Sequence, residues 1–154
     1  MDLRALTIWQ PWASLIIAGF KPYEFRPRPA PRALWGQRIV IHAGARPPRP
    51  NEMVELMEDL LAGRNCGGLD PKCLPLLERA VAEPKWLPLS AGLGTALMGR
   101  SVLSSALWPG EFRNDSDRLD KANYALPLSK IDRWEPVVPA RGFQGWPTWQ
   151  GQTR

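Results

Sequence analysis

Side chains that could recognise or act on a ligand gather near the N-terminus, in the stretch TIWQPWASLIIAGFKPYEFR at residues 7–26. The candidates are Trp9, Gln10, Lys21, Glu24 and Arg26. The tryptophan offers a face for stacking, and the glutamine and glutamate can hydrogen-bond the polar edges of a base. The arginine adds a planar fork that suits phosphate or a base edge. These residue types predict contact with a nucleotide-like ligand.

Lys21 has three interpretations. Contact with a phosphate or another ligand is the first, and a structural ion pair with Glu24 is the second. Catalysis by Lys21, assisted by Glu24, is the third. A lysine that acts as base or nucleophile needs a neutral amine, whereas a nearby carboxylate favours the charged form. Glu24 and Arg26, two residues apart on a predicted strand, can also form a simple surface pair.

Three short elements must position these side chains. Residues 4–9 alternate and contain β-branched and aromatic types, which predicts a strand. Pro11 suits a first helical turn, and Gly19 ends a short helix. Residues 21–26 alternate again and predict a returning strand. If the helix folds back on the sheet, the candidate side chains come within reach of one another.

Four further candidates lie outside this stretch: His42, Arg141, Gln144 and Trp146. His42 ends the clearest predicted strand, residues 37–42, and is expected to be structural or to hydrogen-bond a ligand. Residues 141–149, RGFQGWPTW, combine Gly, Gln and Trp, which suits the grip of a base or phosphate. The alternative is that Trp146 and Trp149 plug one end of the β core.

The rest of the chain predicts helices, strands and long connections. Helices are expected at residues 51–62, with Asn51 as the N-cap, and from Asp70 to Pro84. These two form an acidic helical insertion, at about residues 50–84, on the outside of a β core. Further strands are expected at residues 95–106, at 124–134 and at 137–138, with Gly99 marking a bulge or a close backbone approach. The connections are a Pro-rich segment at 27–32, a turn at 92–95 and a loop at 109–123 with a helical turn at 117–121.

The length of 154 residues predicts one domain, spanning residues 1–154. The chain has 17 Pro and 13 Gly, which favours short strands over long helices. We therefore expect an α+β fold: a small β-barrel of about five or six mainly antiparallel strands, flanked by about three helices.

The net charge is +5, and the first 50 residues carry eight Lys and Arg against Asp2 and Glu24. This bias favours a polyanionic partner. Cys66 and Cys73 are the two cysteines, and with a single histidine they predict free thiols, with no metal site and no cofactor. The N-terminus has no signal-peptide pattern and no apolar run could span a bilayer, so we expect a cytoplasmic protein without a membrane partner.

The pattern from Gln10-Pro11-Trp12-Ala13 through Gly19 to Arg26, with GxKxxExR at its end, resembles the opening of ASCH (activating signal cointegrator homology) domains. Tyr124-Ala125-Leu126, Pro139 and the RGFQGWPTW run look like that family's closing strand and its Gly, Gln and Trp cluster. The resemblance implies a PUA-like barrel, a cleft lined by the GxKxxExR segment, and RNA or nucleotide-related ligands.

Some members of that family are amidohydrolases of acetylated cytidine, and there a lysine matching Lys21 is catalytic. In them a threonine stands at the position of Glu24, and a later strand supplies a glutamate. This sequence has Glu24 instead, and residues 95–106 contain no acidic residue. The pattern is closer to the cointegrator type, in which similar domains bind nucleic acid.

The sequence therefore predicts a nucleic-acid-binding domain, with RNA or a single strand as the partner and RNA favoured over DNA. A small hydrolase, either a nucleoside amidohydrolase or a nuclease with Lys21 as the reactive group, is the alternative. A protein-interaction module is the third possibility.

Overall fold

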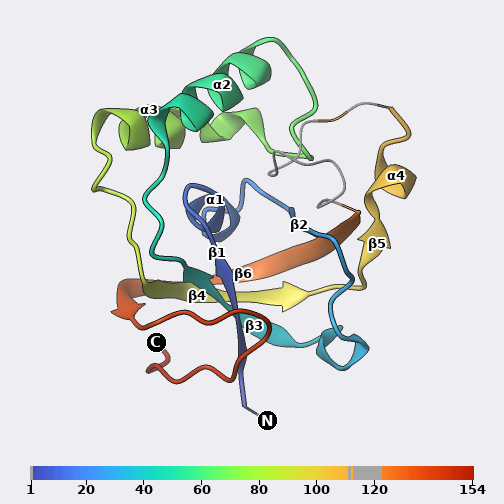
Figure 1. Cartoon of the computed structure of the whole chain (residues 1–154), viewed down its shortest axis with the longest axis vertical. Coiled ribbons are helices and arrows are strands. Elements are labelled where there is room, and N and C mark those ends of the chain that lie inside the picture. The colour runs from blue at the N-terminus through green and yellow to red at the C-terminus, as the bar shows by residue number, and fades with distance from the viewer. Residues whose placement is uncertain (1, 111, 113–122) are drawn as a thin grey trace.

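A curled, mixed β-sheet frames the molecule (Figure 1). The computed structural model describes residues 2–110, 112 and 123–154. The sheet follows the order β1-β3-β4-β6-β2, and β5 pairs with β6. The strands are β1 (Arg4–Ile8), β2 (Tyr23–Arg26), β3 (Arg38–Ala43), β4 (Ala91–Met98), β5 (Val102–Leu103) and β6 (Tyr124–Pro139). Only β1 and β3 run parallel within this sheet, so the expected α+β class with mainly antiparallel strands is confirmed.

The strand β6 joins the two halves of the curl. It pairs with β2 and β5 near its start and with β4 along the rest. The prediction of two separate strands at 124–134 and 137–138 is wrong, because β6 is one strand of 16 residues. Pro136 lies where the register with β4 shifts between Gly92 and Gly94, so its missing N–H removes no hydrogen bond of the ladder.

The sheet stops short of a closed barrel. In the described part of the chain, the edge strands β1 and β2 form no ladder with each other, so the expected full closure is wrong. The guanidinium of Arg26 crosses this seam instead, since its Nη2 donates to the carbonyl of Thr7 at 3.0 Å. Residues 147–149 run along β1: the Ala5 N–H donates to the Pro147 carbonyl at 2.9 Å. The sheet is thus a half-barrel with one edge covered by the end of the chain.

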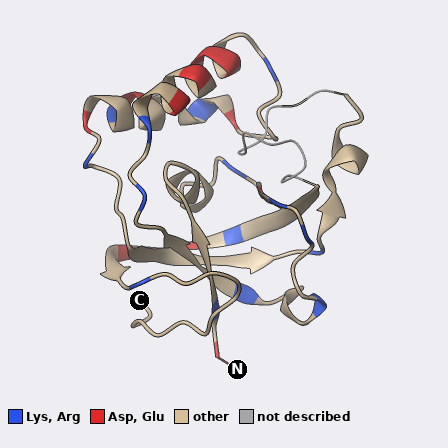
Figure 2. Cartoon of the chain, in the orientation of Figure 1, with Lys and Arg blue, Asp and Glu red and all other residues tan. Residues whose placement is uncertain are grey.

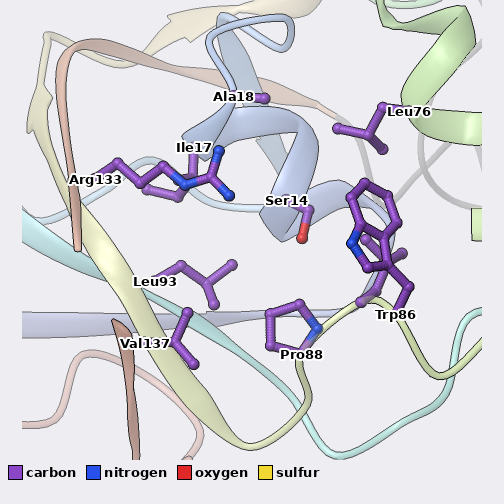
Figure 3. A pocket seen from close by; sticks show the side chains of 10 residues that line it. Ser14, Ile17, Ala18, Leu76, Trp86, Pro88, Leu93, Arg133 and Val137 are labelled. Atoms are coloured by element: carbon purple, nitrogen blue, oxygen red, sulfur yellow. The ribbon is translucent and has the colours of Figure 1, made fainter. Parts of the chain in front are cut away.

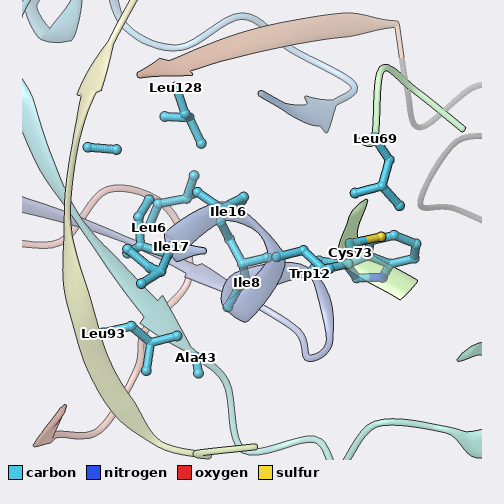
Figure 4. Close-up of a cluster of buried hydrophobic side chains, with 14 of the residues drawn as sticks. Leu6, Ile8, Trp12, Ile16, Ile17, Ala43, Leu69, Cys73, Leu93 and Leu128 are labelled. Carbon is cyan, nitrogen blue, oxygen red and sulfur yellow. The ribbon is translucent and has the colours of Figure 1, made fainter. Parts of the chain in front are cut away.

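The helix α1 (Trp12–Ile17) lies inside the curl, between the sheet and the helices α2 (Pro50–Leu61) and α3 (Leu74–Ala82) (Figure 1). A 3-10 turn, η2 (Pro71–Cys73), precedes α3, and a short α4 (Ser104–Leu107) follows β5. Apolar side chains of α1 meet those of the strands and of η2 in one buried cluster (Figure 4). At the end of α1, Gly19 adopts φ +84°, a left-handed conformation that favours glycine.

The two predicted outer helices are present with shifted starts. The N-cap of α2 is Arg49, with Pro50 in the first turn, so the prediction of Asn51 as the cap is wrong. Proline needs no N–H partner at this position, which explains the earlier start. The Asp70 side chain does cap the second helical segment, since it accepts from the Lys72 N–H at 3.0 Å.

The segment predicted as one strand at 95–106 is divided into three elements. β4 begins four residues earlier and includes the expected turn at 92–95, so both predictions are wrong. β4 ends before Gly99, where an added Cβ would lie 3.0 Å from the Pro127 Cβ; the close approach expected of this glycine is confirmed. The chain then forms β5 and α4. The predicted helical turn at 117–121 lies outside the described residues.

The Pro-rich connection is mostly exposed, as expected. Ala30 is the exception: it is buried, and its N–H donates to the Ser101 hydroxyl at 3.0 Å. A 3-10 turn, η1 (Arg32–Leu34), then leads toward β3. Acidic side chains concentrate on α2, whereas the connection after β2 carries basic ones (Figure 2). None of the helices in the described ranges is long and apolar enough to cross a membrane.

Candidate functional site

A buried ionic cluster lies at the start of β2. The side chains of Lys21 and Glu24 are 2% and 6% exposed, and Lys21 Nζ lies 3.7 Å from Glu24 Oε1. Lys21 Nζ also donates to the Tyr23 carbonyl and lies 4.9 Å from the centre of the Phe25 ring. The ion pair between Lys21 and Glu24 is therefore present, and the Lys21 ammonium is withdrawn from solvent.

The second oxygen of the Glu24 carboxylate, the one that does not face Lys21, binds Arg26. Glu24 Oε2 accepts from Arg26 Nη2 at 3.1 Å, and Oε1 accepts from the Phe25 N–H at 3.1 Å. The Arg26 side chain is 36% exposed and also donates to Thr7 across the seam. Arg26 is thus the partly exposed end of a fixed cluster, whose geometry suits a second, external anion.

On the far side of the seam, Thr7 and His42 extend the ionic cluster, because Arg26 donates to the Thr7 carbonyl and the Thr7 hydroxyl contacts His42. We call this set of five residues, Lys21, Glu24, Arg26, Thr7 and His42, the polar line. Thr7 Oγ1 lies 3.1 Å from His42 Nδ1, and His42 Nε2 lies 2.6 Å from the Ala140 carbonyl. A carbonyl can only accept, so His42 Nε2 carries the hydrogen of the bond to Ala140. His42 is 1% exposed and ties β3 to the chain beyond β6. This is the structural alternative expected for His42.

A cavity of about 380 Å³ opens beside Thr7 and His42. Ala5 and Pro139 also line it, and the remaining walls, which include Arg141, Phe143 and Trp149, come from the C-terminal segment, which we define as residues 140–154. Phe143 is 52% exposed, and the Arg141 guanidinium carbon lies 5.4 Å from the centre of its ring. Two aromatic rings, one guanidinium and the hydroxyl of Thr7 therefore surround one space.

Small residues make this cavity possible. A Cβ on Gly142 would lie 2.6 Å from His42 Cε1 and 2.8 Å from Thr7 Oγ1. The Trp149 ring packs on Trp134, with centroids 5.7 Å apart, and crosses Gly92 at a place where an added Cβ would meet it at 2.5 Å. The glycines thus let the C-terminal segment lie directly on the outer face of the sheet.

The other C-terminal candidates play different parts. Gln144 is exposed and lines neither this cavity nor the ionic cluster. Trp146 is half-buried and packs against the main apolar cluster, and its carbonyl accepts from Arg4 Nη1 at 3.3 Å. Trp146 is therefore closer to the plugging role than to a stacking surface.

Trp9 and Gln10 follow β1 but have different surroundings: the first is exposed and the second is buried. Trp9 is 56% exposed, and the guanidinium carbon of Arg46 lies 4.2 Å from the centre of its ring. Gln10 is 1% exposed: its Nε2 donates to the Ser14 hydroxyl at 2.7 Å and to the Pro88 carbonyl at 2.8 Å. Its Oε1 accepts from the Ser14 N–H at 3.0 Å, so the amide caps the first turn of α1. The amide of Gln10 is committed to the fold, while Trp9 offers a surface.

The structure therefore joins Lys21, Glu24, Arg26 and His42 in one polar line and places Arg141 on the neighbouring cavity. Sequence reasoning missed Thr7, Phe143 and the pairing of Trp9 with Arg46. The alternation that places Thr7 on one face with Ala5 could have indicated Thr7, because His42 lies on the same face of β3. Phe143 gave no separate signal, since the cavity it lines is completed by Thr7 and His42 from distant parts of the chain.

The described residues contain no group of three or more His, Cys, Asp and Glu side chains that could hold a metal ion. Cys66 and Cys73 are both buried, and neither takes part in a disulfide. Burial, reinforced by the charge of Asp70, raises the pKa of the Cys73 thiol to about 11. Cys73 is therefore an inert core residue rather than a nucleophile.

A scan of the chain against models of known protein families finds no match, and a search of the curated proteins finds none either.

Proposed function

We propose that this chain is an ASCH-type, PUA-like domain that binds single-stranded RNA at the seam between β1 and β2. The observation that carries the proposal is the cavity of about 380 Å³ beside Thr7, where Phe143, Trp149 and Arg141 meet. Proteins that recognise single-stranded RNA stack unpaired bases on aromatic rings and guanidinium planes and read base edges by hydrogen bonds. The cavity offers each of these contacts.

The size of the cavity favours one base rather than a longer ligand. Ligand pockets span about 300–1,000 Å³, and 380 Å³ lies near the lower limit. A base that enters here would contact the exposed Phe143 ring, and the Thr7 hydroxyl lies in the cavity wall. Arg141 would meet the phosphate beside that base, because its side chain is exposed at the rim.

Arg26 extends this site along the backbone of the strand. Its guanidinium is fixed by the Glu24 carboxylate and the Thr7 carbonyl, so little side-chain entropy is lost when a phosphate binds. Exposed Arg28 and Arg32 follow on the same connection, which carries basic side chains (Figure 2). Lys21 and Glu24 act as positioning residues in this scheme, since both are buried beneath Arg26.

The hydrolase alternative gains no separate support from the described geometry. Catalysis by Lys21 requires a neutral amine that reaches the substrate. The Lys21 Nζ is instead buried beside the Glu24 carboxylate. We therefore retain the binding function alone.

Fluorescence anisotropy tests the proposal with labelled single-stranded RNA, the matching DNA strand and an RNA duplex, at low and near-physiological salt. Arg26→Gln and Arg141→Gln should each weaken RNA binding and reduce the salt slope by about 0.7 per lost phosphate contact. Phe143→Ala should cost about 1–3 kcal/mol, the usual contribution of one stacked base.

Arg64→Gln is the matched control, because it removes one exposed guanidinium that lies after α2 and pairs with Asp59. Its RNA affinity should stay within about twofold of the wild-type affinity, because salt screens a charge that lies far from the site. If no strand binds at micromolar concentrations in low salt, or if Arg64→Gln weakens binding as much as Arg26→Gln, the proposed site is wrong. Equal binding of every nucleic acid would instead indicate a purely electrostatic surface.

A further inference from the structure

A second cavity, of about 310 Å³, lies on the α1 face of the sheet, away from the seam (Figure 3). The helix α1, the strands β4 and β6, and the connection from α3 to β4 enclose it. Its walls are mostly apolar, with Ile17 on one side, Leu93 and Val137 below and Trp86 opposite. Because none of its lining residues lines the cavity beside His42, the two sites are separate.

One polar group in this cavity is the Ser14 hydroxyl, whose oxygen points into the space (Figure 3). Gln10 Nε2 donates to this oxygen at 2.7 Å, so the acceptor side of the hydroxyl is engaged. A hydroxyl still has its own proton to donate. No hydrogen bond recorded among the described residues uses that proton within the fold. The bond from the buried Gln10 amide therefore leaves the Ser14 proton available to an acceptor in the cavity.

The second polar group is the guanidinium of Arg133, which reaches from β6 toward α1 (Figure 3). Its only ion pair in the described part of the chain is with Glu135, from Nε to Oε1 at 3.4 Å, and both side chains are well exposed, at 61% and 78%. Such a long and solvated contact is weak. A carboxylate held at the cavity mouth can take its place with better geometry, because a guanidinium binds carboxylates through two parallel hydrogen bonds.

The geometry points to a binding site for a small monocarboxylate with a compact apolar body, such as a single-ring aromatic acid. The body packs between Trp86, Leu93 and Val137, while the carboxylate meets Arg133 and the Ser14 hydroxyl. The volume supports this size, since 310 Å³ equals the share of about ten liquid water molecules, at about 30 Å³ each. A phosphate dianion is disfavoured, because the apolar walls leave most of its oxygens without donors.

Nuclear magnetic resonance of the full chain tests this inference with three probes of one shape: 3-phenylpropionate, 3-phenylpropanol and 3-phenylpropylamine. The readouts are the Trp86 indole signal and the backbone amides of Ser14 and Ala18. We expect the acid to shift all three signals and to bind about three- to tenfold more tightly than the alcohol, as one charge-assisted hydrogen-bond pair allows. The amine should bind most weakly.

Two variants at exposed positions change the charge at the mouth without disturbing the core. Arg133→Gln should abolish the preference for the acid over the alcohol. Glu135→Gln should strengthen acid binding about two- to threefold, because it removes the competing carboxylate. Ala18→Leu should fill the space and block all three probes. Arg64→Gln, beyond the end of α2, should change nothing.

The inference fails if the acid shifts none of the three signals in the wild type. It also fails if the alcohol and the amine bind as tightly as the acid, or if Glu135→Gln weakens acid binding. Loss of RNA binding in the seam variants would leave this test untouched, because the two cavities share no residue.

Discussion

Removal of the Glu24 carboxylate should destabilise the protein strongly. Its side chain is 6% exposed and lies between Lys21 Nζ, 3.7 Å away, and Arg26 Nη2, 3.1 Å away. Breaking a buried ion pair by removing one partner costs about 3–5 kcal/mol, because a charge stays buried without its counterion. Glu24→Ala should therefore lower the free energy of unfolding by about 3 kcal/mol or more, and the melting temperature by about 6–12 °C for a chain of this size.

Urea unfolding of a double-mutant cycle measures this effect. Lys21→Met removes the other charge, and the double variant should recover part of the loss, with a coupling above about 1 kcal/mol. The exposed pair Arg79 and Glu83, with side chains 55% and 60% exposed, is the control and should couple by no more than about 0.5 kcal/mol. A cost for Glu24→Ala below about 1 kcal/mol, or coupling equal to that of the exposed pair, would refute this reasoning.

Two further predictions concern the core. In urea unfolding, Gly94→Ala should lower the free energy of unfolding by about 3 kcal/mol or more, because the φ of Gly94 is +152° and an added Cβ would lie 2.3 Å from the Asp132 carbonyl oxygen. Gly110→Ala is the control: an added Cβ there has no atom within 4 Å, so it should change the free energy of unfolding by less than about 0.5 kcal/mol. The raised pKa of the Cys73 thiol means that the folded chain keeps a proton that the unfolded chain loses above pH 9.0. The stability of the wild type relative to Cys73→Ala should therefore be constant below about pH 9 and fall by about 2–3 kcal/mol toward pH 11; a difference that does not change with pH would contradict the assignment.

Local patterns predicted the elements whose boundaries are set by nearby residues. The alternation in residues 4–9 and 21–26 gave β1 and β2, and Gly19 gave the end of α1. The β-branched run before His42 gave β3. Residue spacing also placed Lys21 and Glu24 close enough to pair, because both lie within one short turn and strand.

Contacts between distant segments were beyond local patterns. One partner of His42 is Ala140, and one partner of Gln10 is Pro88, so neither role could be read from neighbouring residues. The predicted division into strands at 124–134 and 137–138 missed that β6 continues past Pro136, because the register shift against β4 tolerates a proline there. The cavity near Thr7 is assembled from three separate parts of the chain, which only the folded sheet brings together.

The most direct test of the proposed function is an NMR titration of the labelled protein with a short single-stranded RNA. The account predicts that the largest shifts fall on Thr7, Arg141, Gly142 and the Trp149 indole, with little change in the amides of α2. Shifts confined to α2 and α3, or the absence of shifts at RNA concentrations that saturate binding by anisotropy, would contradict the placement of an RNA site at the seam.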